Sequence, residues 1–179
     1  MAINLASCDT RWQAAFLDGF TTNALKVTVV DRDGLTFLGD FLDHEDLYRF
    51  LPELENPDQA GDWLSRAFGK RGYLFFRLEA RQDRMPVGFM VFNRKADGSL
   101  VLGGAIRKDC RGNGFASEIL AGLRHFLQER KVPHAVYADV LRANVPVIRA
   151  LEKAGFKEIP ARSSGDTVRF SLVPGSKTP

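Results

Sequence analysis

Three consecutive apolar segments joined by short turns constrain the fold of this chain more than any other feature of its sequence. The segments are YLFFRLEA (73–80), PVGFMVFNR (86–94) and GSLVLGGAIR (98–107). They are rich in aromatic and β-branched residues, and the turn-forming stretches RQDRM and KADG separate them. Turns this short join antiparallel neighbours. The sequence therefore predicts an antiparallel meander of three strands.

After the meander, the spacing of the apolar residues becomes helical. The segment ASEILAGLRHFLQERK (116–131) places one apolar side on a long helix, formed by Ile119, Leu120, Leu123, Phe126 and Leu127. The elements expected after it are a strand at 134–141, a helix at 143–155, and two strands at 156–159 and 167–173. This order of strands and helices predicts a mixed α/β (α+β) layered fold.

The segment before the meander adds further elements to this unit. Four apolar residues between positions 10 and 20 have helical spacing, and we favour an amphipathic helix that packs on the domain over one that binds a partner. The next expected elements are strands at 24–30 and 31–38 and helices at 47–51 and 56–69. At 179 residues we expect one domain, with a helical extension at 1–24, the domain itself at 25–173, and a disordered tail at 174–179.

Charge and cysteine content narrow the class of protein. The net charge is only +3 and no basic tract is present, which makes nucleic-acid binding unlikely to be the function. Cys8 and Cys110 are the two cysteines, too few for a disulfide framework and typical of a reducing compartment. No apolar stretch approaches eighteen residues, so we expect no membrane span and a cytoplasmic location.

A glycine-containing loop opens the long helix, within RKDCRGNGFASEIL (107–120). Glycine inside a helix costs about 0.5–1 kcal/mol relative to alanine, so two glycines here suggest that a ligand approaches the backbone. A helix N-terminus of this kind favours the binding of a phosphate, and Arg111 could donate two hydrogen bonds to the phosphate oxygens. The donors would be the backbone N–H groups of Gly112, Asn113, Gly114, Phe115 and Ala116. The alternative is a flexible glycine-containing loop before an ordinary helix. The sequence of the loop matches neither a Walker loop nor a dinucleotide-binding fingerprint.

The loop and the segments after it resemble the GNAT superfamily of N-acetyltransferases from about residue 25 onward. In that family an Arg/Gln-x-x-Gly-x-Gly/Ala motif holds the pyrophosphate of acetyl-CoA. A later strand leads through Val-x-x-x-Asn into a helix that ends in Glu-Lys-x-Gly-Phe. The matching residues are Ile106, Arg111, Gly114 and Ala116, then Val140 and Asn144, then Glu152, Lys153, Gly155 and Phe156.

The resemblance implies a central sheet of about seven strands that splays apart at the acetyl-CoA site. Acetyl-CoA would be the cosubstrate, with its pantetheine near Ala105 and Ile106; Asn144 would bind the pantetheine arm or cap its helix. The implied reaction is direct acetyl transfer to a primary amine on a small molecule or a protein N-terminus. A loose similarity points to the branch that acetylates ribosomal and other protein N-termini. Homodimerisation, a catalytically weak acyl-CoA-binding module, and an unrelated nucleotide- or RNA-binding domain stay open.

Acetyl transfer to an amine needs a group that removes a proton, and Asp139 is the favoured base. Strand alternation puts Tyr137 and Asp139 on the face opposite Val136, Ala138 and Val140. An aspartate bonded to nearby backbone at a strand end is an equally good explanation. Glu79 is the second candidate for the base.

The general acid is where this sequence departs from the family. Relatives place a Tyr or a Ser at positions that hold Leu151 and Val147 here, so Tyr137 would donate the proton or the thiolate would leave unassisted. Cys110 lacks an assignable partner for thiol catalysis. His44, His125 and His134 are dispersed, so no metal site is expected. Acidic residues that could attract a cationic amine, or simply form a solvated helical face, are Asp43, Glu45, Asp46, Glu53, Glu55, Asp58 and Asp62.

Overall fold

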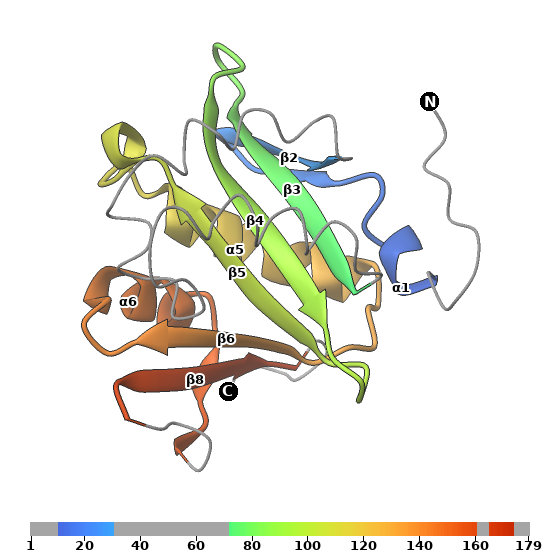
Figure 1. The fold of residues 1–179 in the computed structure, drawn as a ribbon. Coiled ribbons are helices and arrows are strands. Elements are labelled where there is room, and N and C mark those ends of the chain that lie inside the picture. The colour runs from blue at the N-terminus through green and yellow to red at the C-terminus, as the bar shows by residue number, and fades with distance from the viewer. Residues whose placement is uncertain (1–10, 31–71, 161–164, 174–179) are drawn as a thin grey trace, which may run out of the picture.

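The sheet is the dominant element of the computed structural model, which describes residues 11–30, 72–160 and 165–173. Its eight strands have the order β1-β2-β3-β4-β5-β6-β8-β7 (Figure 1). The strands are β1 (Phe20–Thr21), β2 (Leu25–Val30), β3 (Tyr73–Ala80), β4 (Pro86–Arg94), β5 (Leu100–Ile106), β6 (Val136–Leu141), β7 (Lys157–Glu158) and β8 (Thr167–Leu172). The mixed α/β fold expected from the sequence is therefore confirmed.

The meander formed by β3, β4 and β5 is antiparallel throughout, as predicted. Phe76 of β3 lies opposite Met90 of β4, which lies opposite Gly104 of β5. Phe76 and Met90 both point into the main core, so this register sets one apolar face across the three strands.

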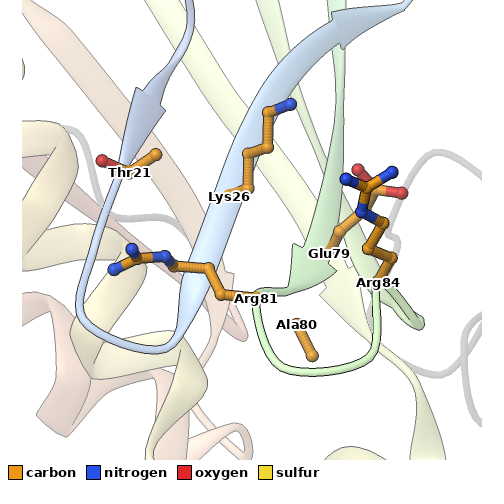
Figure 2. Close-up of a pocket in the computed structure, with 6 residues that line it drawn as sticks. All are labelled: Thr21, Lys26, Glu79, Ala80, Arg81 and Arg84. Carbon is orange, nitrogen blue, oxygen red and sulfur yellow. The ribbon is translucent and has the colours of Figure 1, made fainter.

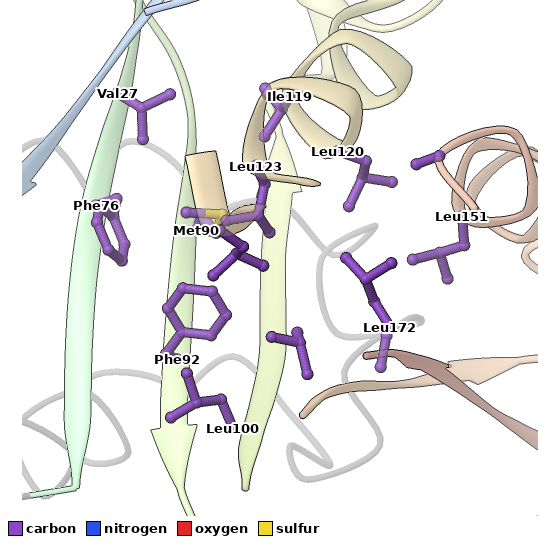
Figure 3. Packing of buried hydrophobic residues seen from close by; sticks show 14 of the residues in the cluster. Val27, Phe76, Met90, Phe92, Leu100, Ile119, Leu120, Leu123, Leu151 and Leu172 are labelled. Atoms are coloured by element: carbon purple, nitrogen blue, oxygen red, sulfur yellow. The ribbon is translucent and has the colours of Figure 1, made fainter. Parts of the chain in front are cut away.

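The helices of the described chain are α1 (Arg11–Ala14), α5 (Phe115–Glu129) and α6 (Val145–Lys153), with a 3-10 turn, η2 (Lys108–Cys110). The two long helices pack against each other and on one face of the sheet. The side of α5 that the sequence predicted to be apolar is the side that is buried. Figure 3 shows Leu123 of α5 near Met90 of β4, and Leu151 of α6 near Leu172 of β8. This core fixes the starts of both helices relative to the sheet.

β5 and β6 part from each other along their length, which confirms the predicted splay. They form the parallel pair of the described sheet, and their pairing ends at Leu102 and Ala138 after three residue pairs. β5 stays paired with β4 as far as Ile106, and β6 stays paired with β8 as far as Leu141. The two strands therefore diverge toward α6 and η2, as Figure 1 shows.

The N-terminal helix is shorter than the sequence predicted. α1 ends at Ala14, and the chain then turns through Gly19, which has φ +61°. A Cβ on Gly19 would lie 2.0 Å from the carbonyl oxygen of Val27, so this close approach to β2 excludes a continuing helix. Phe20 instead starts β1 and pairs with Val27. Phe16 is nevertheless fully buried in the main core, so the segment packs on the domain.

Several predicted elements lie outside the described residues. They are the strand at 31–38, the helices at 47–51 and 56–69 with their acidic residues, and the tail at 174–179. In the part of the chain that is described, no helix is long and apolar enough to cross a membrane.

Candidate active site

The loop between β5 and α5 has the backbone of an anion cradle. Gly112 has φ +82° and Gly114, the N-cap of α5, has φ +77°, a left-handed conformation that glycine adopts without steric cost. A Cβ built on either glycine would meet no other atom within 4 Å. The loop therefore leaves open space on the side where side chains at these positions would project.

Backbone donors converge at this loop. The first bond that closes α5 runs from the N–H of Glu118 to the carbonyl oxygen of Gly114. Five N–H groups that the sequence predicts as anion donors come earlier in the chain than Glu118: those of Gly112, Asn113, Gly114, Phe115 and Ala116. None of the described residues accepts a hydrogen bond from any of these five groups. Such donors and the positive end of the helix dipole together bind anions.

Arg111 is anchored between this loop and the end of β5. Its Nε donates a hydrogen bond to the carbonyl oxygen of Ile106 at 3.0 Å, and the side chain remains exposed. The positive charge is thereby held beside the loop. One backbone acceptor at Ile106, which the sequence analysis assigned to the pantetheine, is already used by the protein.

A second arginine stabilises the start of the loop, and the sequence analysis missed it. Arg107 donates from Nε and Nη2 to the two carboxylate oxygens of Asp109, at 2.6 and 2.5 Å. This pairing lowers the pKa of Asp109 to about 2. The only sequence indication was the Arg-x-Asp spacing, which is too common to be informative.

Cys110, next to Asp109, has its side chain turned into the core. Burial raises the pKa of the Cys110 thiol, and the neighbouring Asp109 carboxylate raises it further. A thiol held in the protonated form is a poor nucleophile.

The two asparagines of the candidate site differ in their use. Asn113 donates its side-chain amide to the carbonyl oxygen of Cys110 at 3.1 Å, so it braces the loop from within. Asn144 occupies the N-cap position of α6 but makes no side-chain capping bond. Its amide is therefore not occupied by the capping role that was the alternative explanation for this residue.

Tyr137, Asp139 and Arg169 form a cluster on the face of β6 and β8 opposite the main core. The alternation of β6 is as predicted, with Val136, Ala138 and Val140 buried. Asp139 accepts two hydrogen bonds from Arg169, at 2.6 Å from Nε and 2.5 Å from Nη2. The same guanidinium carbon lies 5.8 Å from the centre of the Tyr137 ring. The bonds to Asp139 raise the pKa of Arg169.

Glu79 lies apart from this cluster. It is on β3, which β4 and β5 separate from β6 in the sheet. Its Oε1 is 2.9 Å from Nη2 of Arg77 on the same strand. The structure therefore brings Tyr137 and Asp139 together and leaves Glu79 elsewhere.

The positions at which relatives carry a Tyr or a Ser are apolar here. Leu151 is only 1% exposed and belongs to the main core, so its side chain contributes to core packing. Val147 is half-buried in the first turns of α6. Partly buried apolar residues that pack on the core from β5, α5 and α6 include Leu102, Ile106, Phe115, Ala116, Val147 and Ile148.

No group of three or more His, Cys, Asp or Glu side chains within residues 11–30, 72–160 and 165–173 comes together in a way that could hold a metal ion. The residues gathered at the splay are instead backbone donors, one anchored arginine, and apolar side chains. Such a set suits a ligand that is anionic at one end and apolar along its length.

Solved structures of acetyltransferases share this fold. An acetyltransferase of the GNAT family from Bacillus anthracis is 18% identical, with a TM-score of 0.66 over 86% of this chain and 97% of that one. A spermidine N-acetyltransferase from Vibrio cholerae, solved with CoA and spermine, is 16% identical, with a TM-score of 0.68 over 84% and 95%. A ribosomal-protein-S5-alanine acetyltransferase from Vibrio fischeri is 12% identical, with a TM-score of 0.65 over 89% and 98%.

Sequence comparison agrees with the likeness in fold. None of the curated proteins compared with the chain is significantly similar to it in sequence. A profile of the acetyltransferase (GNAT) domain, however, matches residues 25–157, which contain the meander, the anion cradle and the splayed strands. The chain belongs to the GNAT family of acetyltransferases.

Proposed function

We propose that this protein transfers the acetyl group of acetyl-CoA to a primary amine by direct attack in a ternary complex. The observation that carries the proposal is the position of the anion cradle, which follows the end of β5 through η2, on the side where β5 has parted from β6. A ligand bound at the cradle by its phosphates can extend its pantetheine arm between the two strands.

The residues present fit acetyl-CoA. The open space beside Gly112 and Gly114 leaves room for a pyrophosphate, the N–H groups from Gly112 to Ala116 are donors for its oxygens, and Arg111 adds a charge. The backbone near Ala105 and the amide of Asn144 would bind the pantetheine. Acetyl-CoA supplies the activated acetyl group, and the protein supplies binding, orientation and proton transfer.

The proton lost by the attacking amine is assigned to Asp139. An alkyl ammonium with a pKa of about 10.4 is nearly all protonated at neutral pH, so a base assists the reaction. Both carboxylate oxygens of Asp139 already accept hydrogen bonds from Arg169. Each oxygen keeps a further lone pair that can take the proton, and neutralising the carboxylate would remove its charge pairing with Arg169, so Arg169 becomes part of the proposed mechanism.

The departing thiolate has a different candidate partner from that of the relatives. Because the side chains of Leu151 and Val147 are hydrocarbons, neither can donate a proton. Tyr137 is the phenol of β6, and it lies where β6 still pairs with β5 through Val101. A thiol with a pKa of about 8.5 also leaves tolerably without help near neutral pH.

The acceptor is proposed only as a class, a primary amine on a small molecule or a protein N-terminus. Two of the similar structures are those of a spermidine N-acetyltransferase and a ribosomal-protein-S5-alanine acetyltransferase. Their identities of 16% and 12% support the fold and do not choose between these acceptors.

A second candidate function is an acyl-CoA-binding module with weak turnover. Two observations favour it: the carboxylate of Asp139 is engaged by Arg169, and a buried leucine stands at the usual tyrosine position. This module would bind acetyl-CoA as the enzyme does and differ in the chemical step alone.

Calorimetry with acetyl-CoA, followed by thiol-release assays against polyamines, amino acids and N-terminal peptides, tests the proposal. Arg111→Ala should weaken acetyl-CoA about tenfold or more, because a charge-assisted hydrogen bond contributes about 1.5–3 kcal/mol. ATP is the control nucleotide and should not bind measurably. Binding without release from any amine would favour the module, and failure of acetyl-CoA to bind would overturn both functions.

A further inference from the structure

A pocket with a mainly basic lining lies at the edge of the sheet formed by β1 and β2. It has a volume of about 320 Å³ and is lined by Thr21, Lys26, Glu79, Ala80, Arg81 and Arg84 (Figure 2). These residues come from β1, β2, the end of β3 and the turn between β3 and β4. The anion cradle contributes none of them, so the pocket is separate from the acetyl-CoA site.

The charges of the lining do not balance within the pocket. Lys26, Arg81 and Arg84 contribute three positive charges, and Glu79 contributes the one negative charge of the lining. Glu79 is already paired with Arg77, which is not a lining residue. Neither Lys26 nor Arg84 forms an ion pair or a side-chain hydrogen bond with any residue that the structure describes. The lining therefore has an excess of positive charge without internal compensation.

Arg81 is held in place on the wall of the pocket. Its Nη1 donates to the carbonyl oxygens of Thr22 and Asn23, at 3.0 and 3.2 Å, and its backbone N–H donates to Ala24 at 2.8 Å. Figure 2 shows its side chain extending toward the turn between β1 and β2. An arginine fixed in this way loses little conformational entropy when it binds an anion.

Arg84 adopts a backbone conformation that arginine disfavours. Its φ is +60°, and the turn is closed by bonds from Arg84 N–H to Ala80 and from Ala80 N–H to Met85, both 2.9 Å. Asp83 is not among the residues that line the pocket, and its Oδ1 accepts the N–H of Met85 at 2.9 Å. Glycine would take this conformation more readily. A non-glycine residue in this conformation at a pocket wall is one observation that points to a ligand site.

We propose that this pocket binds a small anion that carries a phosphate group. Three cationic side chains, one from β2 and two from the turn between β3 and β4, match the two negative charges and three oxygens of a phosphate better than the single charge of a carboxylate. The volume is at the lower end of that of small-ligand sites, which suits a compact phosphate compound. The proposal concerns a second site and does not depend on the acetyl-transfer reaction.

Calorimetry on the full chain with inorganic phosphate, at constant ionic strength and with saturating CoA present, tests the proposal. Because CoA occupies the cradle, the remaining phosphate binding reports the pocket. Lys26→Gln and Arg84→Gly should each weaken phosphate about tenfold. Glycine suits the conformation at position 84, so this variant should fold at least as well as the parent. Lys157→Gln, which removes the same charge from β7 at the opposite edge of the sheet, is the matched control and should change nothing.

Three results would overturn the proposal. They are no phosphate binding in the presence of CoA, equal phosphate binding by the parent and a variant that combines Lys26→Gln with Arg84→Gly, or loss of binding in Arg111→Ala with retention in the pocket variants. Titration with glycerol 3-phosphate shows which kind of anion the pocket prefers. Tighter binding than that of inorganic phosphate indicates a phosphate ester as the ligand, and weaker binding indicates free phosphate. Acetyl-CoA affinity should be the same in Lys26→Gln, Arg84→Gly and the parent, which separates this test from that of the proposed function.

Discussion

Asp139 and Arg169 lie directly opposite each other on β6 and β8 and are joined by two hydrogen bonds, 2.6 and 2.5 Å long. The pair links β6, the strand that forms one wall of the splay, to its neighbour β8. It holds the carboxylate in place. Whether Asp139 acts as the base or only as a cross-strand contact is therefore open to a direct comparison of the two partners.

Asp139→Asn should lower the turnover of acetyl transfer by about 10²–10⁴-fold while acetyl-CoA affinity stays nearly unchanged. The loss should shrink as the pH rises, because the amine then deprotonates without help. Arg169→Met should cost far less turnover, since it leaves the carboxylate in place, but should lower the free energy of unfolding by about 1 kcal/mol. Steady-state rates across pH 6–9 and urea unfolding give both measurements. Equal turnover of Asp139→Asn and the parent would make Asp139 structural.

Gly114→Val should weaken acetyl-CoA binding at least tenfold in a folded protein. The new side chain would enter the open space beside the cradle and impose a left-handed strain of about 1–2 kcal/mol. Gly165→Val is the matched control, because Gly165 has φ +54° and equally open surroundings but lies before β8. Calorimetry should show lost affinity for the first variant and parental affinity for the second. The same affinity in both would refute the cradle.

The pair formed by Arg107 and Asp109 should be insensitive to pH over the working range of the enzyme. The folded-state pKa of Asp109, about 2, lies below its usual value of about 3.9. The pair therefore stabilises the fold fully above about pH 4, and this contribution is lost as the pH falls toward 2. Urea unfolding of the parent and of Asp109→Asn should differ at pH 7 and converge near pH 2. A difference that persists at pH 2 would contradict this assignment.

Leu151→Tyr should not restore the general acid found in relatives. The site is only 1% exposed and closely packed, so the larger ring should lower the free energy of unfolding by about 1–3 kcal/mol. Its hydroxyl would also need a partner inside the core. Thermal unfolding and thiol-release rates of the variant should show a lower melting temperature and no gain in turnover. A stable and faster variant would mean that the core opens toward the ligand at this point.

The features that were predictable from the sequence are those set by local periodicity. The meander, the buried side of α5 and the alternation of β6 follow from the spacing of apolar residues, which neighbouring segments do not change. The helix expected at 10–20 failed because it depends on a distant contact. Only the position of β2 shows that Gly19 must lie against Val27 and that Phe20 must enter the sheet.

The candidate site likewise has features that the sequence could predict and features that it could not. The cradle was predictable because Arg111, Gly112 and Gly114 are adjacent in the chain and the backbone itself supplies the donors. The pairing of Asp139 with Arg169 was not, because it depends on the register of two strands separated by α6 and β7. Leu151 could be recognised as a departure from the family, but its full burial required the packing of α6 on the sheet.

Where β5 and β6 separate, the sheet has two edges in its interior. The chain from β1 to β5 and the chain from β6 to β8 are each continuous antiparallel sheets, and three residue pairs join them. Unpaired strand edges attract other extended chains, which is why most proteins shield the outer edges of their sheets. An extended molecule lodged between β5 and β6 would act as a strand shared by both halves. Filling the splay would then protect from hydrogen exchange those N–H groups between Gly103 and Ile106 that do not already pair with β4, so this sheet would be complete only with its ligand.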